Sequence, residues 1–323
     1  MGKKVRFWPG RLLFPALLGV LLLTHLACLG SERQMFGFVA RKMDREPQIT
    51  VYIKETKQKK RMGLEEYLAG VVAGEMRPGW PIEAYAAQAI VARTFTMDFL
   101  ARGGTRKLHG TDISTDEKEA QAYNQRAVTP LIRRAVAMTK GKVMTYKGRF
   151  VRGWFSASCG GRTALAKEGL AFKEREPAYI SSVSCPEAQV IPAEEQYWEA
   201  GFSPTELAAA LKKINKDVGN VQKLEVIRKS RSGRAVALHV TGAKGRTRVH
   251  GADLRMALDP TKMRSIILLA VENTPQGFRM KGRGFGHGVG LCQWGAYALA
   301  KKGQSPEEIV KHYYPKVQIM DIW

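Results

Sequence analysis

The chain has 323 residues, 45% of them hydrophobic and 9% aromatic, enough to bury a large core as one big domain or two smaller ones. This composition excludes a wholly disordered chain and a small disulfide-stapled scaffold, and its single long apolar run excludes a protein with several membrane spans. Lysine and arginine outnumber aspartate and glutamate by 52 to 29. The resulting formal charge of +23 indicates an acidic partner, which could be nucleic acid, anionic lipid or cell-wall polymer.

The N-terminus predicts a membrane segment. An apolar run at 12–29 follows four basic residues, Lys3, Lys4, Arg6 and Arg11. The basic end stays in the cytoplasm, so the rest of the chain is expected on the other side. No clear cleavage site follows, which favours an uncleaved single-pass anchor at 1–30 over a cleaved signal. We therefore expect a cell-membrane protein whose main domain is extracytoplasmic, with no nucleic-acid partner.

Residues 31–62 are predicted to form a basic stalk and a first strand at 48–54, with the basic run 57–61 as a turn. The remaining residues, 63–323, are expected to form the main folded domain. Its first helix covers 64–76 and ends before Pro78. A second helix runs from about 81 to 100. A third is predicted at 117–138, although Pro130 argues against its second half.

Further along the chain the pattern becomes richer in strands. The run 143–151 predicts a hairpin, and strands are expected within 224–250, 265–272 and 277–282. About 200–275 is therefore a candidate β-rich subdomain. Two capping boxes, Ser203–Glu206 and Ser305–Glu308, predict helix starts, and another helix is expected at 293–302. Helices and strands come in blocks, which predicts an α+β fold with helices packed on antiparallel sheet or hairpins.

Glu75 is the first candidate for chemistry. Helical spacing puts it on the apolar stripe of the helix 64–76, whereas Glu65 and Glu66 fall on faces expected to be solvated. An acid held against apolar groups has a raised pKa and can donate a proton to a glycosidic oxygen. The alternatives are that Glu75 pairs with Arg77 or Arg93, or faces water at the helix end. Periodicity alone does not decide between them.

Two polar residues of the predicted second helix are further candidates, and one of them, Arg93, interrupts its apolar face. Arg93 could pair with a buried carboxylate or bind an anionic group of a substrate. Gln88 is either a satisfied helix amide or a group that reaches a sugar hydroxyl.

A second motif has glycine at every second position from 282 to 290. As an extended strand it would have one face free of side chains, so that a ligand could approach closely. The spacing does not fit a dinucleotide or phosphate loop. His287, within this motif, could orient a substrate group or be structural.

Cysteine is rare. Outside the leader only Cys159, Cys185 and Cys292 remain, which allows one disulfide among them at most. No cysteine or histidine spacing typical of zinc is present, so we expect neither a metal nor a cofactor. Cys159 and His287 would permit a thiol nucleophile if the fold brought them together.

The motifs, taken together, resemble the stage II sporulation protein D family, which also contains amidase-enhancer modules. The resemblance spans about 64–314. It rests on Ala73-Gly-Glu-Met76, Trp80-Pro-x-Glu-Ala84, Ala87-Gln-Ala-x-x-Ala-Arg-Thr94, His109, Gln121-Ala-Tyr123, Cys159-Gly-Gly161, Tyr179, Gly284-Phe-Gly-His-Gly-Val-Gly290 and Gln293-Trp-Gly295.

The resemblance implies a membrane-anchored lytic transglycosylase that cuts the bond from N-acetylmuramic acid to N-acetylglucosamine and leaves 1,6-anhydro ends. It would act on peptidoglycan in septal wall remodelling and engulfment during endospore formation, with an amidase and other engulfment proteins as further partners. Glu75 matches the catalytic acid. The predicted substrate-binding residues are Gln88, Arg93, Tyr123, Gly160, Gly161, His287, Gln293 and Trp294. The alternative is a non-enzymatic wall-binding activator of an N-acetylmuramoyl-L-alanine amidase.

One departure from the family concerns zinc. Some members carry two histidines and two cysteines between the first histidine motif and Gln-Ala-Tyr. Here only His109 remains, with Ser114, Glu119 and Ala120 at the other positions, so no metal is predicted there. A disulfide between Cys159 and Cys185 is the one covalent link expected.

Overall fold

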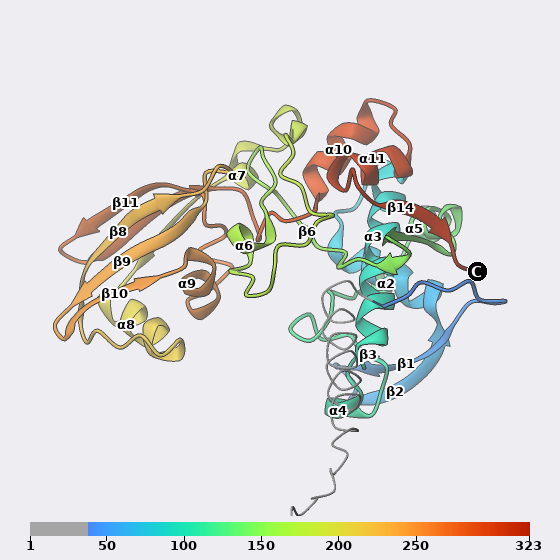
Figure 1. The fold of residues 1–323 in the computed structure, drawn as a ribbon, viewed down its shortest axis with the longest axis horizontal. Helices are drawn as coiled ribbons and strands as arrows, with labels where there is room; N and C mark the ends of the chain where they lie inside the picture. The colour runs from blue at the N-terminus through green and yellow to red at the C-terminus, as the bar shows by residue number, and fades with distance from the viewer. Residues whose placement is uncertain (1–37) are drawn as a thin grey trace, which may run out of the picture.

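The computed structural model describes residues 38–323, so the predicted anchor at 1–30 lies outside the described residues. Within the described part, no helix combines the length and the apolar character that a membrane crossing requires. Two large hydrophobic cores organise this α+β chain. Figure 1 shows them at opposite ends of an elongated molecule, one mainly helical and one built on sheets, with a stretch of loops between them.

The helical part begins with a three-stranded sheet in the order β2-β1-β3, formed by β1 (Gln48–Ile53), β2 (Gln58–Gly63) and β3 (Ile113–Ser114). β1 pairs antiparallel with β2 and parallel with β3. The basic run 57–61 was expected to be a turn, and this is wrong. Only Lys57, with a φ of 56°, belongs to the turn, and the other basic residues lie on edge strand β2. Charged side chains on an edge strand protect it from pairing with other chains.

Three helices pack behind this sheet: α2 (Leu64–Glu75), α3 (Ile82–Ala101) and α5 (Pro130–Met138). α3 is buried over most of its length, because its alanines allow α2, α5 and the C-terminal helices to approach closely. A short helix, α4 (Arg106–His109), follows it. The predicted helices 64–76 and 81–100 are confirmed to within two residues at each end.

The third predicted helix is only half right. Residues 117–129 form a loop with one short 3₁₀ turn, η1 (Gln125–Ala127), and the helix begins at Pro130. Pro130 therefore does not argue against the second half of the predicted helix, which is the half that forms. Proline at the first helical position has no amide to satisfy, and the side chain of Thr129 accepts a hydrogen bond from the Ile132 amide as N-cap.

The Thr129 cap provides a stability prediction. Thr129→Ala is expected to lower the free energy of unfolding by about 1 kcal/mol, because the Ile132 amide loses its partner. Chemical denaturation of the full chain measures this difference, and Thr129→Ser should retain most of the stability. Equal stability of Thr129→Ala and the unchanged chain would show that the cap does not hold α5.

The remaining elements of the helical end come from residues 142–156 and from the C-terminal residues 291–321. The predicted hairpin is present as β4 (Lys142–Tyr146) and β5 (Arg149–Phe150), and β14 (Gln318–Asp321) pairs with β4. β6 (Phe155–Ser156) pairs parallel with β13 (Leu291–Cys292), which leads directly into α10 (Gln293–Lys301) and then α11 (Pro306–Tyr313). The connecting loops contain α6 (Ala166–Gly169), η2 (Pro186–Gln189) and α7 (Ala193–Gln196).

The other end of the molecule contains two three-stranded antiparallel sheets, β10-β9-β8 and β11-β12-β7, with their own core. The elements are β7 (Tyr197–Phe202), α8 (Pro204–Lys213), β8 (Val221–Lys229), β9 (Ala235–Gly242), β10 (Gly245–Val249), α9 (Gly251–Ala257), β11 (Leu268–Thr274) and β12 (Gly277–Arg283). The predicted strands and both capping boxes are present. That this β-rich part is a separate subdomain stays a prediction.

The glycine motif differs from its prediction. Strand β12 ends at Arg283, and the glycines at 284, 286, 288 and 290 all have φ between 70° and 105°. The segment is therefore a series of left-handed turns and not an extended strand with one bare face. At Gly288 a side chain would collide with the guanidinium of Arg234. The glycines allow this tight path past a buried arginine.

Candidate active site

Glu75 is the last residue of α2 and is partly buried. Its Oε1 accepts a hydrogen bond of 2.8 Å from the backbone amide of Ala122. Burial raises the pKa of Glu75 to about 7; the Ala122 amide opposes the shift and the nearby charge of Glu117 adds to it. Near neutral pH this carboxyl is therefore present in both its acid and its carboxylate form.

Two glycines explain why the loop carrying Ala122 reaches Glu75. A side chain at Gly70 would overlap the ring of Tyr123, and one at Gly74 would collide with the backbone at 122–123. The loop is held there by the backbone amide of Asn124, which donates a hydrogen bond to the Gly70 carbonyl at 2.8 Å. One face of α2 is thus flat enough for another chain segment to cover its end.

The arginines considered as partners of Glu75 bind other carboxylates. Arg93 is fully buried and pairs with Glu65, with 2.6 Å between Nη2 and Oε2 and 3.0 Å between Nε and Oε1. Arg77 pairs with Glu195. Glu75 therefore pairs with neither Arg77 nor Arg93, and that alternative is wrong.

Glu65 corrects a second expectation. It was predicted to be solvated, yet its side chain is only 14% exposed and also accepts a hydrogen bond from the Gly141 amide at 3.1 Å. Glu66 is exposed, as predicted, and pairs with Lys60 at the surface. The two neighbours differ because only Glu65 faces the buried guanidinium of α3.

Aromatic side chains gather beside the segment that follows Glu75. Trp80 lies with its ring centroid 4.8 Å from that of Trp294 and 5.1 Å from that of Tyr297. The Arg77 guanidinium lies 5.8 Å from the centroid of the Trp294 ring. The first turn of α10 is thereby placed against the loop after α2. Trp294 and the neighbouring Gln293 are both buried.

Two other predicted substrate-binding residues, Tyr123 and Gln88, lie at this end of the molecule. Tyr123 is partly buried, its ring is stacked on Tyr67 at 5.5 Å, and its hydroxyl donates to Gln125. Gln88 is fully buried in α3, and its amide has no hydrogen-bond partner among the described residues. The burial of Gln88 and Arg93 removes both from the surface, so neither can contact a polymer in this conformation.

The remaining predicted substrate-binding residues are His287, Gly160 and Gly161. They lie near Arg234 and Glu187, two residues that the sequence did not indicate as functional. The Nδ1 of His287 accepts from the Val289 amide at 3.0 Å, and burial with two nearby arginines lowers the pKa of His287 to about 3. Its ring is therefore neutral. The amide of Gly161 donates to Glu187 at 2.6 Å, and Gly160 packs against Ile267.

The cysteines correct the expected disulfide, because Cys159, Cys185 and Cys292 are all free and buried. Cys159 has no exposed surface, and burial raises the pKa of its thiol well above the usual range. A thiol nucleophile needs access and a low pKa, so the Cys159–His287 hypothesis has no support.

His109 lies where some relatives of the resembled family bind zinc. In this chain its Nε2 bonds to Glu119 at 2.8 Å, and its ring stacks on Tyr52 at 3.9 Å. One of the replaced ligand positions is thus the hydrogen-bond partner of the remaining histidine.

Two sizeable hollows lie away from Glu75. One of about 560 Å³ lies between β8 and β11, and one of about 440 Å³ is lined by residues that include Glu65, Arg133 and Lys140. Glu75 lines neither, so the hollows do not mark the position of the candidate acid.

Two family models match parts of the chain. The family model described as Stage II sporulation protein matches residues 52–146, which contain Glu75 and the Ala122 loop. A second model, a domain of unknown function called DUF8618, matches residues 192–290.

Relatives cover most of the chain. An uncharacterized protein of Brachyspira hyodysenteriae (strain ATCC 49526 / WA1) is 32% identical over 261 residues, 80% of this chain and 67% of its own length. Stage II sporulation protein D of Bacillus subtilis (strain 168) is 28% identical over 84% of this chain and 79% of its own length. The amidase enhancer of the same strain is 25% identical over 77% of this chain and 39% of its own length. The chain belongs to the stage II sporulation protein D family.

Proposed function

We propose that this protein is a lytic transglycosylase that cleaves peptidoglycan glycan strands with Glu75 as its acid. The observation that carries the proposal is the environment of Glu75, which raises its pKa to about 7 with a backbone amide as its hydrogen-bond partner. An acid of this kind is protonated often enough near neutrality to donate a proton. The family to which the chain belongs supports a role at the cell wall.

One carboxyl suffices for the proposed reaction. The protonated Glu75 gives its proton to the oxygen of the bond from N-acetylmuramic acid to N-acetylglucosamine, and that C–O bond breaks. The resulting carboxylate then takes the proton of the muramic acid 6-hydroxyl while O6 bonds to C1. Glu75 regains its proton, no water is consumed, and the product carries a 1,6-anhydro end.

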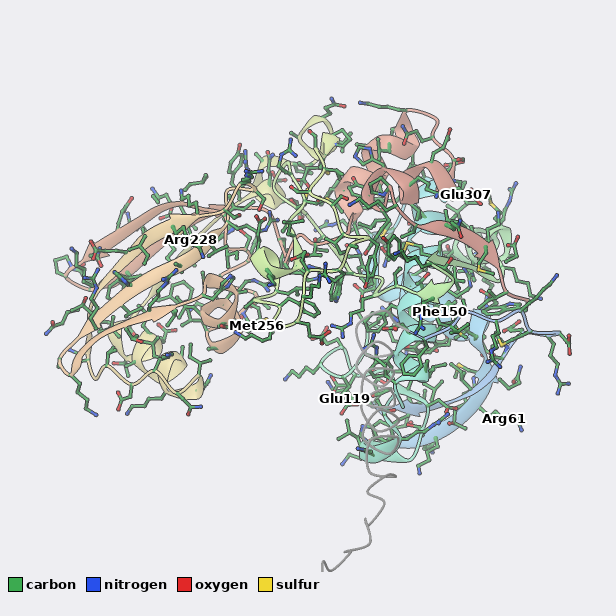
Figure 2. The ribbon with its side chains drawn as sticks, viewed as in Figure 1. Arg61, Glu119, Phe150, Arg228, Met256 and Glu307 are labelled. Atoms are coloured by element: carbon green, nitrogen blue, oxygen red, sulfur yellow. The ribbon has the colours of Figure 1, made fainter. Side chains whose placement is uncertain are left out.

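The proposed setting is the outer face of the cell membrane during endospore formation, in septal wall remodelling and engulfment. The leader at 1–30 would hold the domain near the wall, and an amidase and other engulfment proteins would be its partners. Positive charge supports this setting. Figure 2 shows basic side chains along the whole molecule, with the exposed Arg61 on β2 and Arg228 on β8 at opposite ends.

The test incubates the purified full chain with glycan strands and identifies the products by mass spectrometry. Muropeptides with anhydro ends are the expected result, at an amount that grows with time and enzyme. Products with reducing ends only would contradict the transglycosylase and indicate an ordinary hydrolase.

The similarity to an amidase enhancer favours a second candidate, a non-enzymatic module that binds the wall and stimulates an amidase. This candidate predicts no anhydro product from the chain alone and faster amidase turnover when the two proteins are mixed. Measuring both products in the same reactions distinguishes the two functions.

The raised pKa of Glu75 predicts the pH dependence of the activity. Because the acid form donates the proton, the initial rate of anhydro product should fall about tenfold per pH unit once the pH exceeds about 7. Rates measured from about pH 5 to 9 test this. A rate that stays constant up to pH 9 would show that Glu75 is not the proton donor.

The raised pKa of Glu75 also makes the stability of the folded chain depend on pH. Between its ordinary pKa of 4.5 and about 7, Glu75 keeps a proton in the folded chain that the unfolded chain releases. The unfolding free energy therefore falls as pH rises through this window. Glu75→Gln should be more stable than the unchanged chain above pH 7, by at most about 3 kcal/mol, and equally stable near pH 4.

A further inference from the structure

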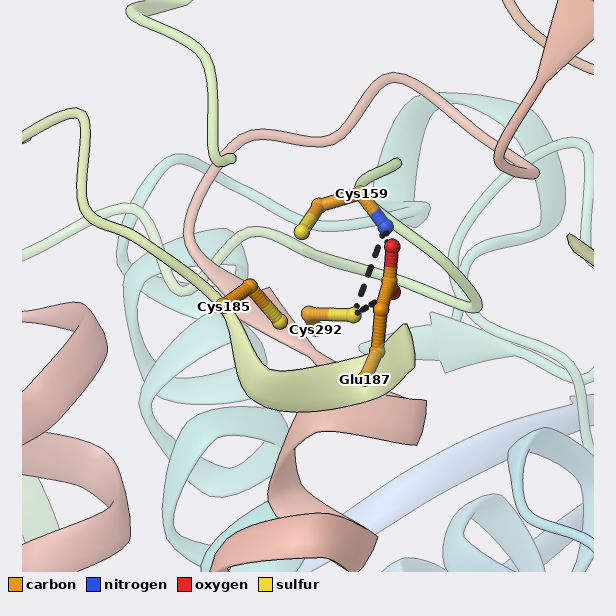
Figure 3. A group of neighbouring side chains, drawn as sticks. All are labelled: Cys159, Cys185, Glu187 and Cys292. Carbon is orange, nitrogen blue, oxygen red and sulfur yellow. Dashed lines mark hydrogen bonds between the residues drawn. The ribbon is translucent and has the colours of Figure 1, made fainter. Parts of the chain in front are cut away.

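Four buried side chains from distant parts of the sequence converge where the loops after β6 pack on the core of the helical end. They are Cys159, Cys185, Glu187 and Cys292, here called the thiol cluster. One ligand atom from each, three Sγ and a carboxylate oxygen, all lie within 4.8 Å of one another. Figure 3 shows the four side chains pointing toward a common centre, with Glu187 on η2 and Cys292 just before α10.

The cluster is sealed from solvent. Cys159, Cys292 and Glu187 have no exposed surface, and Cys185 is 7% exposed. A buried carboxylate costs free energy unless it is paired, bonded or bound to a metal. Glu187 sits 2.8 Å from the Cys292 sulfur and accepts hydrogen bonds from two amides, those of Cys159 at 3.1 Å and Gly161 at 2.6 Å.

The donor atoms suit a transition metal. In a tetrahedral zinc site with bonds of about 2.3 Å, sulfur atoms lie about 3.8 Å apart, so small side-chain rotations would bring this cluster to that geometry. Thiolates select zinc among the abundant divalent ions, and a set of four protein ligands leaves no position open for catalysis. Hydrogen bonds from the Cys159 amide at 3.3 Å and the Gly295 amide at 3.4 Å already orient the Cys292 sulfur.

The surroundings are also electrostatically suited. Three thiolates, one carboxylate and Zn²⁺ would carry a net charge of about −2, which buried positive charge must offset. Arg234, only 1% exposed, donates to the carbonyl oxygens of Cys159 at 2.9 Å and Arg162 at 3.1 Å. Cys292 is the N-cap of α10, so the positive end of that helix also faces the cluster.

We propose that Cys159, Cys185, Cys292 and Glu187 bind one structural Zn²⁺. This site is separate from the family zinc position near His109, where His109 bonds to Glu119. The metal would join the loop after β6, η2 and the start of α10, with ligands up to 133 residues apart. It would also fix the loop of Gly160 and Gly161 relative to Trp294, whose ring packs on Trp80. The proposal does not depend on the transglycosylase activity.

The first experiment measures metal in the unchanged full chain. The protein is purified with zinc and a reductant, freed of unbound metal, and analysed for zinc by mass spectrometry. About one zinc per chain is expected. Replacement of zinc by cobalt(II) should produce strong thiolate-to-cobalt absorption bands together with the visible bands of a tetrahedral ion. A cobalt-loaded chain without thiolate bands would overturn the proposal, independently of any variant.

Variants then assign the ligands. Cys159→Ser and Cys292→Ser should each lower bound zinc to less than about a tenth of the unchanged value. Cys28→Ser is the matched control, since it removes a cysteine outside the cluster, and Glu119→Gln tests the His109 position. Both controls should keep their zinc. Zinc that stays in the cluster variants, or is lost in Glu119→Gln alone, would overturn the assignment.

The competing fate of the cluster is a disulfide between two of its thiols. Non-reducing peptide mapping of the unchanged chain, purified in the presence of zinc, separates the two. Zinc bound with all three thiols alkylatable after denaturation supports the metal site. A disulfide between two of the three cysteines with no zinc bound would replace it.

Discussion

Replacing Glu75 by glutamine is expected to lower the rate of anhydro-product formation by about 10²–10⁴-fold. Glutamine has nearly the same shape, and its amide oxygen can still accept the hydrogen bond from Ala122. It cannot donate and then recover a proton in the pH range of the reaction. The substitution therefore removes the chemistry and leaves the local packing in place.

Initial rates on purified glycan strands measure this effect. Glu66→Gln is the matched control, because Glu66 lies on the same helix but is exposed and pairs with Lys60 at the surface. It should keep the activity of the unchanged chain. Equal product from Glu75→Gln and the unchanged chain would remove Glu75 as the acid, while amidase stimulation that survives in Glu75→Gln would support the non-enzymatic alternative.

Replacing Arg93 by methionine is expected to lower the free energy of unfolding by about 3 kcal/mol. The guanidinium is fully buried and bonds to both carboxylate oxygens of Glu65 and to the Lys142 carbonyl at 3.0 Å. Methionine fills a similar volume, so the main loss is the partner of a largely buried carboxylate. A second change, Glu65→Gln, should recover part of this loss because it removes the unpaired charge.

Denaturant unfolding of the full chain measures these differences. Lys60→Met provides the control, since it breaks an exposed pair and should cost less than about 1 kcal/mol. The experiment also decides the role of Arg93. If Arg93 bound substrate, Arg93→Met would weaken substrate binding at unchanged stability; the structure predicts the reverse, with activity retained well below the unfolding temperature.

Local signals in the sequence predicted most helices and strands. The capping boxes at Ser203 and Ser305 and the apolar stripe of α2 are read from residues close together in the chain, and each leads to the element expected. The wrong prediction for residues 117–129 has a tertiary cause. Residues 117–129 have a helical pattern, but this loop is positioned by its contact with Gly70 and Gly74 of α2, which no local pattern reveals.

The candidate site, too, could be predicted from the sequence only in part. The sequence by itself determined the family and the position of Glu75 on an apolar stripe, because both rest on short motifs and local spacing. It left open whether Glu75 is desolvated, paired with an arginine or exposed to water. Only the tertiary structure decided that Arg93 belongs to Glu65 and that the hydrogen-bond partner of Glu75 is the Ala122 amide. The thiol cluster is the clearest case, since its cysteines are spread from 159 to 292. Spacing along the chain argued against a metal there, but ligands are brought together by the path of the folded chain, which pairs β6 with β13.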